Sequence, residues 1–270
     1  GKFVREQHIF RARDLPYQTQ LVPLAAIIAT LGKSWEDHGQ KQKLGRWYWC
    51  GVLGELYGGA IETRFARDLV DVVSWLRDGG PEPKTVLDSS FNPTRLNTLR
   101  SRGSAAYKGI YALLMREGGK DFRTGKPITA QTFDDERIDV HHIFPQKWCK
   151  SEKIDAKVFD SIINKTAISA RTNRMIGGKA PSSYLIEIEK HADIAADTLN
   201  AALATHLIDA SLLREDRFGQ FMSARRAALL TLISEATGKT LGIALDEPEP
   251  IDDDEDDVVE DAGEDQEAAA

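Results

Sequence analysis

The sequence predicts a mainly α-helical protein that carries one small strand–loop–strand–helix unit. Apolar residues recur at helical spacing through the first hundred or so residues and again after residue 183. Between residues 121 and 184 this helical spacing of apolar residues stops, and two short runs there are typical of strands. With 270 residues, of which 41% are hydrophobic, the chain is long enough to bury a substantial core.

Residues 1–119 are predicted to form a helical domain. Gly58-Gly59 separates the first two helices, and Gly79-Gly80-Pro81 ends the second. Asn92 is the expected cap of the third helix, and Gly118-Gly119 closes the block. The helices are expected over residues 44–57, 60–76, 93–100 and 105–116.

Residues 120–238 are predicted to form a second domain. Residues 121–125 are expected to turn, residues 138–143 and 166–169 to form strands joined by a long loop, and a helix to begin after Ala170. Amphipathic helices are expected over residues 183–191, 195–208 and 218–237. The remaining residues, 239–270, are expected to form a disordered acidic tail, because few apolar residues are present to offset the ordering entropy.

His141 and His142 are the most informative residues, because two adjacent imidazoles can divide the work of cutting a phosphodiester. One can bind a metal ion while the other takes a proton from water, since the ordinary pKa of histidine is about 6.5. A divalent ion polarises the phosphate and stabilises the departing oxygen. Neutral N and O ligands suit Mg²⁺ or Mn²⁺, with Ni²⁺ also possible.

The segment Asp139-Val-His-His-Ile-Phe-Pro-Gln146 resembles the first strand and loop of HNH (ββα-metal) endonucleases. Residues 164–173, Asn-Lys-Thr-Ala-Ile-Ser-Ala-Arg-Thr-Asn, are similar to the second strand and helix start, with the same nine-residue step between asparagines. The resemblance implies that His141 and Asn173 bind the metal and that His142 is the general base. It also implies that Asn164 braces the loop that holds the base. Many family members have Asp where His141 stands.

A wider resemblance covers roughly residues 2–235. Arg46-Trp-Tyr-Trp49, the Asp-Phe-x-Thr-Gly turn at 121–125, and residues 177–184 are similar to the nuclease halves of GmrSD-like modification-dependent restriction and phage-defence proteins. This resemblance implies a bacterial, cytoplasmic DNA endonuclease acting on phage or modified double-stranded DNA. It also implies a nucleotide-hydrolysing sensor domain or subunit, for which this chain has no phosphate-binding Gly-rich loop.

Several roles stay open between alternatives. The third metal ligand is Asp139, Asp160, Thr172 or water, although Asp160 is expected to be structural. Four basic residues are the expected DNA contacts: Lys147, Arg171, Arg174 and Lys179. The aromatic residues 47–49 are expected in the core, with base stacking as the alternative. The competing function is a catalytically weak modified-DNA reader or regulatory module, and a weaker enzymatic alternative is RNA cleavage.

Composition excludes several other classes. The longest apolar run, residues 21–29, contains Pro23 and is far shorter than the roughly 18 residues of a membrane span. Two cysteines provide neither a disulfide framework nor a four-cysteine zinc site, which is consistent with a reducing compartment. The chain starts without Met or a signal-peptide pattern, so we expect a fragment or a chain from which a tag was cleaved.

The net charge of −7 is dominated by residues 246–267, which hold fourteen acidic residues and no Lys or Arg. The rest has 35 basic and 28 acidic residues, a net charge of +7 that suits a phosphate-backbone partner. The acidic segment is either an inert solubilising tail or an internal mimic of DNA that covers the basic surface. If it mimics DNA, deletion of residues 246–270 raises DNA affinity at low salt. A gel-shift titration of both forms measures this, and equal affinities would rule out the mimic.

Overall fold

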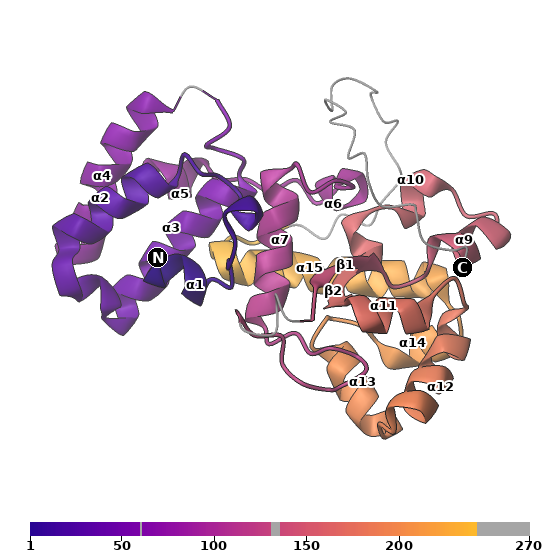
Figure 1. The fold of residues 1–270 in the computed structure, drawn as a ribbon. Helices are drawn as coiled ribbons and strands as arrows, with labels where there is room; N and C mark the ends of the chain where they lie inside the picture. The colour runs from indigo at the N-terminus through magenta and orange to yellow at the C-terminus, as the bar shows by residue number, and fades with distance from the viewer. Residues whose placement is uncertain (60, 131–135, 242–270) are drawn as a thin grey trace.

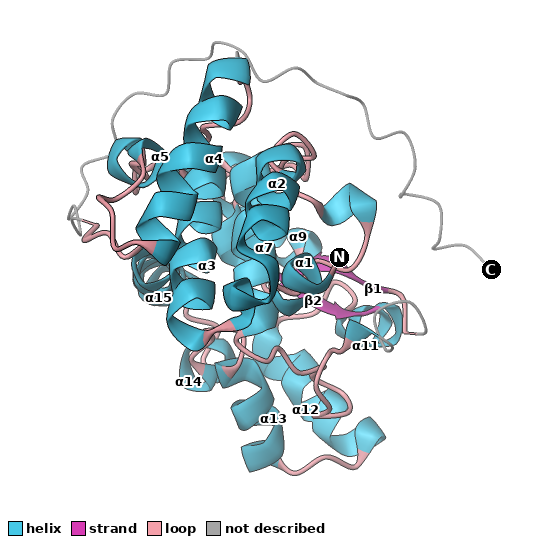
Figure 2. Ribbon diagram, turned by 90° about the vertical axis from the view of Figure 1, so that its left-hand side faces the viewer, coloured by secondary structure: helices cyan, strands magenta, loops and turns pink. Residues whose placement is uncertain are grey.

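The computed structural model describes residues 1–59, 61–130 and 136–241. It is mainly helical with one two-stranded antiparallel sheet, as the sequence predicts, and the hairpin lies beside a cluster of C-terminal helices (Figures 1 and 2). Within the described residues, no helix combines the length and the apolar character needed to cross a bilayer. Most of the expected acidic tail lies outside the described residues.

The first half of the chain is helical throughout. Its elements are α1 (Lys2–Glu6), η1 (Ala12–Asp14), α2 (Leu21–Leu31), η2 (Gly32–Glu36), α3 (His38–Leu53), α4 (Glu62–Arg77), α5 (Lys84–Asp88), α6 (Arg95–Thr98) and α7 (Ala105–Arg116). The expected helix at 105–116 is confirmed, whereas the one at 93–100 is shorter. Leu99 leaves the helix because it adopts an extended backbone, and its carbonyl accepts a hydrogen bond from the Ile162 amide at 2.8 Å.

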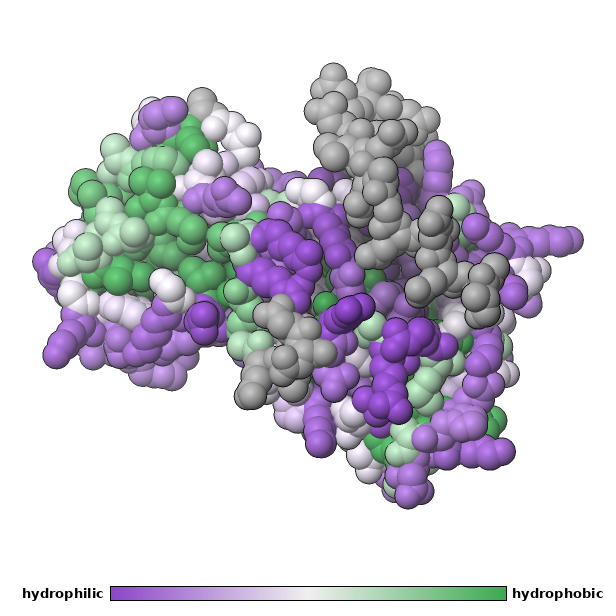
Figure 3. Space-filling model, viewed as in Figure 1, coloured by the Kyte–Doolittle hydropathy of each residue, from purple (hydrophilic) through white to green (hydrophobic). Residues whose placement is uncertain are grey.

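Aromatic side chains form the centre of the N-terminal core. Trp47, Tyr48 and Trp49 on α3 are each at most 1% exposed, and the Trp49 indole donates to Gln7 Oε1 at 2.9 Å. The expected core position of these residues is confirmed, because a side chain without accessible surface has no face to offer to a base. Apolar residues also reach the surface over α2 and α4, where Val22 is 59% and Val70 is 68% exposed (Figure 3).

The second half carries the hairpin and the C-terminal helices. Its elements are β1 (Ile138–His142), α9 (Gln146–Ser151), α10 (Ala156–Phe159), η3 (Ile162–Asn164), β2 (Lys165–Ser169), α11 (Ala170–Ile176), α12 (Pro181–Ala192), α13 (Ala196–Ala204), α14 (Ala210–Arg214) and α15 (Phe218–Thr237). The prediction of a long loop between the strands is wrong, because this segment forms α9, α10 and η3. Cys149 and Phe159 bury their side chains from these short helices, which the hydrophobic periodicity of so short a segment does not reveal.

Helix α15 runs behind both halves of the molecule (Figure 1). Its first turn contributes Phe221 to the core around the hairpin and α12, and its later turns contribute Leu229, Leu230 and Ile233 to the core around α3. The sequence assigns this helix to the second domain, yet much of its apolar face packs against the first. The boundaries at residues 119 and 238 stay a prediction.

Arg225 of α15 is 1% exposed and is surrounded by backbone carbonyls. Its guanidinium donates to the carbonyls of Ile163 and Lys165, the latter at 2.9 Å, and its Nε donates to the His206 carbonyl at 3.2 Å. Burial lowers the pKa of Arg225 to about 9. The carbonyls of Ile163 and Lys165 flank Asn164, so Arg225 holds the backbone on both sides of that residue.

Replacing Arg225 with Met leaves those buried carbonyls without a partner. We expect the free energy of unfolding to fall by about 2–4 kcal/mol, since each unsatisfied buried polar group costs about 1–3 kcal/mol. Urea unfolding measures the change. Arg67→Met on the exposed surface of α4 is the matched control and should change stability by less than about 0.5 kcal/mol. A loss below about 1 kcal/mol at Arg225 would contradict the structural role.

Candidate active site

The register of the hairpin decides which face each histidine occupies. His141 pairs with Thr166 and His142 pairs with Lys165 across the antiparallel strands. Directly opposed residues share a face, and successive residues alternate. His141 and Thr166 therefore lie on one face of the hairpin, and His142 and Lys165 lie on the other. The two histidines are neighbours at the same strand end but point in opposite directions.

His141 is a half-buried, neutral imidazole. Burial lowers its pKa to about 4, with the Asp139 carboxylate opposing this and the nearby Arg102 and His142 reinforcing it. Its Nε2 atom is buried and has no hydrogen-bond partner among the residues that the structure describes. A neutral ring with a buried nitrogen that has no partner is suited to bind a metal ion through that nitrogen.

His142 lies in a polar cluster on the other face. Its Nε2 is 2.9 Å from Asp160 Oδ1, and the same oxygen accepts a hydrogen bond from Lys165 Nζ at 2.8 Å. Burial alone would raise the pKa of Asp160, but the bonds from His142 and Lys165 outweigh it and hold that pKa below its ordinary value. Burial lowers the pKa of Lys165, against the opposing effect of Asp160.

Asn164 fixes the loop that follows His142. Its side chain is fully buried, accepts from the Phe144 amide at 2.8 Å and donates to the Phe144 carbonyl at 2.9 Å. The same amide nitrogen donates to the Phe159 carbonyl at 3.0 Å, and the Asn164 carbonyl accepts from the Ile143 amide at 2.8 Å. One buried side chain thus joins the segment after His142 to the segment that ends beside Asp160.

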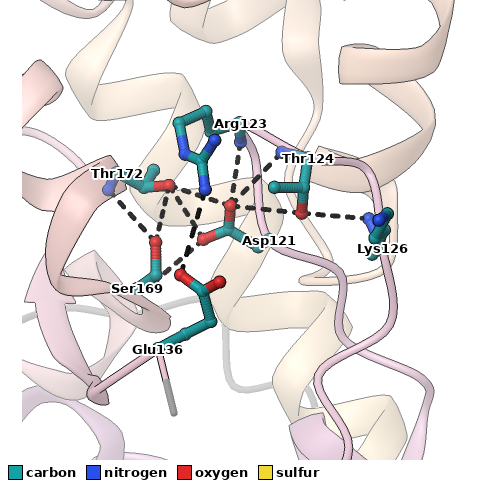
Figure 4. A network of polar contacts seen from close by, with 7 residues as sticks. All are labelled: Asp121, Arg123, Thr124, Lys126, Glu136, Ser169 and Thr172. Atoms are coloured by element: carbon teal, nitrogen blue, oxygen red, sulfur yellow. Dashed lines mark hydrogen bonds and ion pairs between the residues drawn. The ribbon is translucent and has the colours of Figure 1, made fainter. Parts of the chain in front are cut away.

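Helix α11 is attached to the hairpin through Asp121 (Figure 4). This buried carboxylate accepts from the Ser169 amide at 3.0 Å and from Thr172 Oγ1 at 2.8 Å, and Ser169 caps the helix by accepting from the Thr172 amide. The expected turn at 121–125 is present, because the Gly125 amide donates to the Asp121 carbonyl at 2.8 Å. The Asp121 side chain therefore sets where α11, and Asn173 with it, meets the strands.

Asn173 lies half-buried on α11, which contacts both strands. Buried Ile176 of α11 and Ile168 of β2 belong to one apolar cluster. Ile168 shares the face of His141 by strand alternation, so α11 packs on that face. The side chain of Asn173 makes no hydrogen bond to any other residue in the described part of the chain. The structure thus brings the helix of Asn173 to the His141 side of the hairpin.

The three side chains considered as a third ligand all have other partners. Thr172 is fully buried against Asp121, and Asp160 lies between His142 and Lys165. Asp139 forms an ion pair with Arg102. The described residues contain no group of three or more His, Cys, Asp or Glu side chains arranged to hold a metal ion. Of the predicted ligands, His141 keeps a buried nitrogen without a partner among the described residues, and Asn173 lies half-buried on the helix that packs on the same face.

The four predicted DNA contacts lie around α11. Arg171 and Arg174 are exposed and line one surface pocket together with the acidic Glu136 and with Arg137, which the sequence argument did not name. Lys147 of α9 is exposed and runs over Gly178, where an added Cβ would lie 2.6 Å from its Cδ. Lys179 is exposed but pairs with Glu187 at 2.5 Å, so its charge is partly neutralised.

His206 lies just after α13 and contacts the hairpin. The sequence argument did not name it. Its Nδ1 is 2.6 Å from Thr166 Oγ1 and its Nε2 is 2.8 Å from the Lys120 carbonyl. Nε2 must carry the proton to reach that carbonyl, so Nδ1 accepts from Thr166. Burial lowers the pKa of His206 to about 4. A lone histidine with no motif around it gives no sequence signal for this role.

Comparison with known proteins shows one distant relative. The chain is 28% identical over 224 residues to the uncharacterized protein MJ0686 of Methanocaldococcus jannaschii. The matched region covers 74% of this chain and 38% of that protein. The chain therefore spans about two fifths of the length of the relative. No protein-family model and no solved structure matches the sequence.

The buried neutral His206 predicts a pH-dependent loss of stability. Because its folded pKa is about 4 and an unfolded histidine titrates near 6.5, the unfolded chain binds more protons between these values. Stability contributed by the neutral ring is complete above about pH 6.5 and falls as the pH drops towards 4. Relative to His206→Gln, the wild type should lose on the order of 2 kcal/mol over this window. Urea unfolding at several pH values measures the gap, and a pH-independent gap would contradict the prediction.

Proposed function

We propose that this chain is a metal-dependent endonuclease of the HNH (ββα-metal) type that cuts DNA. The observation that carries the proposal is the arrangement around Asn164. Its buried amide holds both the amide and the carbonyl of Phe144, two residues after the proposed base His142. A side chain in that position and with those bonds is what the resemblance assigns to the structural asparagine of such sites.

The opposite directions of the two histidines support a role in phosphodiester hydrolysis. In an in-line displacement the attacking and leaving oxygens lie on opposite sides of the phosphorus. His142, on one face of the strand end, would accept the proton of the attacking water. His141 and Asn173, on the other face, would hold a Mg²⁺ or Mn²⁺ ion, with Ni²⁺ also possible. When bound, the ion would supply charge neutralisation at the phosphate and at the departing 3′ oxygen.

The exposed basic residues supply the attraction for the substrate. Arg171 and Arg174 project from the helix that carries Asn173, and Lys147 lies near the end of that helix. Phosphate contacts of this kind position a duplex without reading its sequence. We therefore propose double-stranded DNA as the substrate, and the resemblance suggests phage or modified DNA in a bacterial defence system, with a nucleotide-hydrolysing sensor domain or subunit as the partner.

The same basic surface would serve a second candidate function, a catalytically weak module that binds modified DNA or regulates a partner. Exposed Arg171 and Arg174 favour DNA binding whether or not a phosphodiester is cut. The two functions differ in one measurable respect: a pure binding module shifts DNA in a gel and leaves it intact.

Supercoiled-plasmid nicking with Mn²⁺ or Mg²⁺ tests the proposal. His142→Ala should lower the rate roughly 10²-fold or more, because general-base catalysis contributes about 10²–10⁴-fold. His191→Ala is the matched control, since His191 is an exposed histidine of α12, and should nick like the wild type. A chelator should stop nicking by wild type and control alike.

The outcomes separate the candidates. Gel-shift binding without nicking by the wild type would favour the binding module. Equal rates for His142→Ala and wild type would remove His142 from the role of base. Labelled RNA and DNA of the same sequence, compared in one assay, show which nucleic acid is cut.

A further inference from the structure

We infer that Asp160 is the positioning residue of the site: it fixes the tautomer and orientation of the His142 ring so that Nδ1 is the atom that takes the proton from water. The inference rests on the proposed function. Sequence reasoning offers Asp160 as one candidate for the third metal ligand and expects it to be structural.

The tautomer follows from the contact of His142 with Asp160. The 2.9 Å separation between His142 Nε2 and Asp160 Oδ1 is a hydrogen bond. An ionised carboxylate only accepts, so Nε2 must carry the hydrogen. The neutral ring has a single N–H, and Nδ1 is then left with its lone pair. In the opposite tautomer, two lone pairs would face each other across this contact.

Asp160 is itself held in place from two sides. Lys165 Nζ donates to the same Oδ1 at 2.8 Å and also to the Arg100 carbonyl at 2.8 Å. The Asp160 amide donates to the Ala156 carbonyl at 3.0 Å at the end of α10. The side chains of Lys165 and His142 are 10% and 17% exposed and that of Asp160 is 35% exposed, so the His142–Asp160 hydrogen bond is partly shielded from water. A fixed carboxylate orients a ring better than a mobile one.

The backbone segments that carry the ring and the carboxylate are joined by one residue. Asn164 donates to the carbonyl of Phe159, immediately before Asp160, as well as to the carbonyl of Phe144. The Phe159 ring meets the imidazole of His142 edge-on, with centroids 6.2 Å apart. The relative position of base and carboxylate is therefore set by buried contacts as well as by their own hydrogen bond.

The proton inventory of the step is complete with these residues. A water O–H bond breaks, its proton goes to His142 Nδ1, and the freed electron pair forms the new bond to phosphorus while the bond from phosphorus to the 3′ oxygen breaks. The 3′ oxygen leaves with the electron pair of that bond and takes a proton from solvent water. The ring becomes an imidazolium, which the Asp160 carboxylate stabilises at Nε2. The imidazolium then releases its proton to solvent. Asp160 stays ionised throughout and never touches the substrate.

A spectroscopic measurement on the metal-free wild type tests the tautomer directly. Two-bond ¹H–¹⁵N correlation at about pH 8, where ordinary imidazoles are neutral, distinguishes a protonated from an unprotonated ring nitrogen. The His142 signals are identified by their loss in His142→Ala. We expect Nε2 protonated and Nδ1 unprotonated, and a mixture of tautomers in Asp160→Ala. Protonation at Nδ1 in the wild type would overturn the inference, whatever the activity.

Kinetics supply the second test. The near-isosteric Asp160→Asn should lower kcat roughly 10–100-fold with little change in KM, the range typical of residues that orient a ligand or base. Asp155→Asn is the matched control, because Asp155 is an exposed carboxylate on the same segment that only caps α10. It should keep wild-type kcat.

The two proposals fail in different ways. In the His142→Ala background, Asp160→Asn should cause no further loss, since Asp160 acts through His142. If His142→Ala is inactive while Asp160→Asn keeps full kcat, the inference is wrong and the proposed function stands. If His142→Ala nicks at the wild-type rate, the proposed function fails and the inference fails with it.

Discussion

The buried side chain of Asn164 is the contact on which the candidate site depends. Its amide oxygen and nitrogen pair with the amide and carbonyl of Phe144, and the same nitrogen reaches the carbonyl of Phe159. No hydrophobic residue can replace these bonds, because the backbone groups of Phe144 would then be buried without partners at a cost of about 1–3 kcal/mol each. The residue is polar because the turn between β1 and α9 needs a donor and an acceptor that strand pairing does not supply.

A second buried polar residue, Arg225, also satisfies backbone groups that would otherwise lack partners, and it does so between segments far apart in the sequence. Arg225 binds the carbonyls on both sides of Asn164 and reaches the carbonyl of His206. A charged group at 1% exposure is expensive unless it is bonded, and here Nε and Nη1 of a residue on the helix shared by both cores donate to three backbone carbonyls. Helix α15 therefore connects the two parts: it packs in the core around α3, and its Arg225 bonds the backbone of the strand that carries Lys165.

Strand alternation gives the two histidines different chemistry. His141, on the α11 face, keeps a buried nitrogen without a partner among the described residues, and burial lowers its pKa to about 4. His142, on the other face, contacts Asp160. A metal ligand needs a neutral lone pair, and a general base needs a ring that is stabilised when it gains a proton. The proposed division of roles between two adjacent histidines rests on this difference, because a strand directs them into different surroundings.

The sequence by itself determined the mainly helical class, the two strands and the helix after Ala170, since these depend on local periodicity. Asn164 bonds the backbone of Phe144, two residues after His142, and its predicted role of bracing the loop that holds the base stays a prediction. Only the tertiary structure decided that α9 and α10 fill the segment between the strands, that Asp160 meets His142, and that Asp121, His206 and Arg225 support the hairpin. These contacts join residues 18 to 62 positions apart, and a single sequence carries no periodic signal for pairings that only folding brings together.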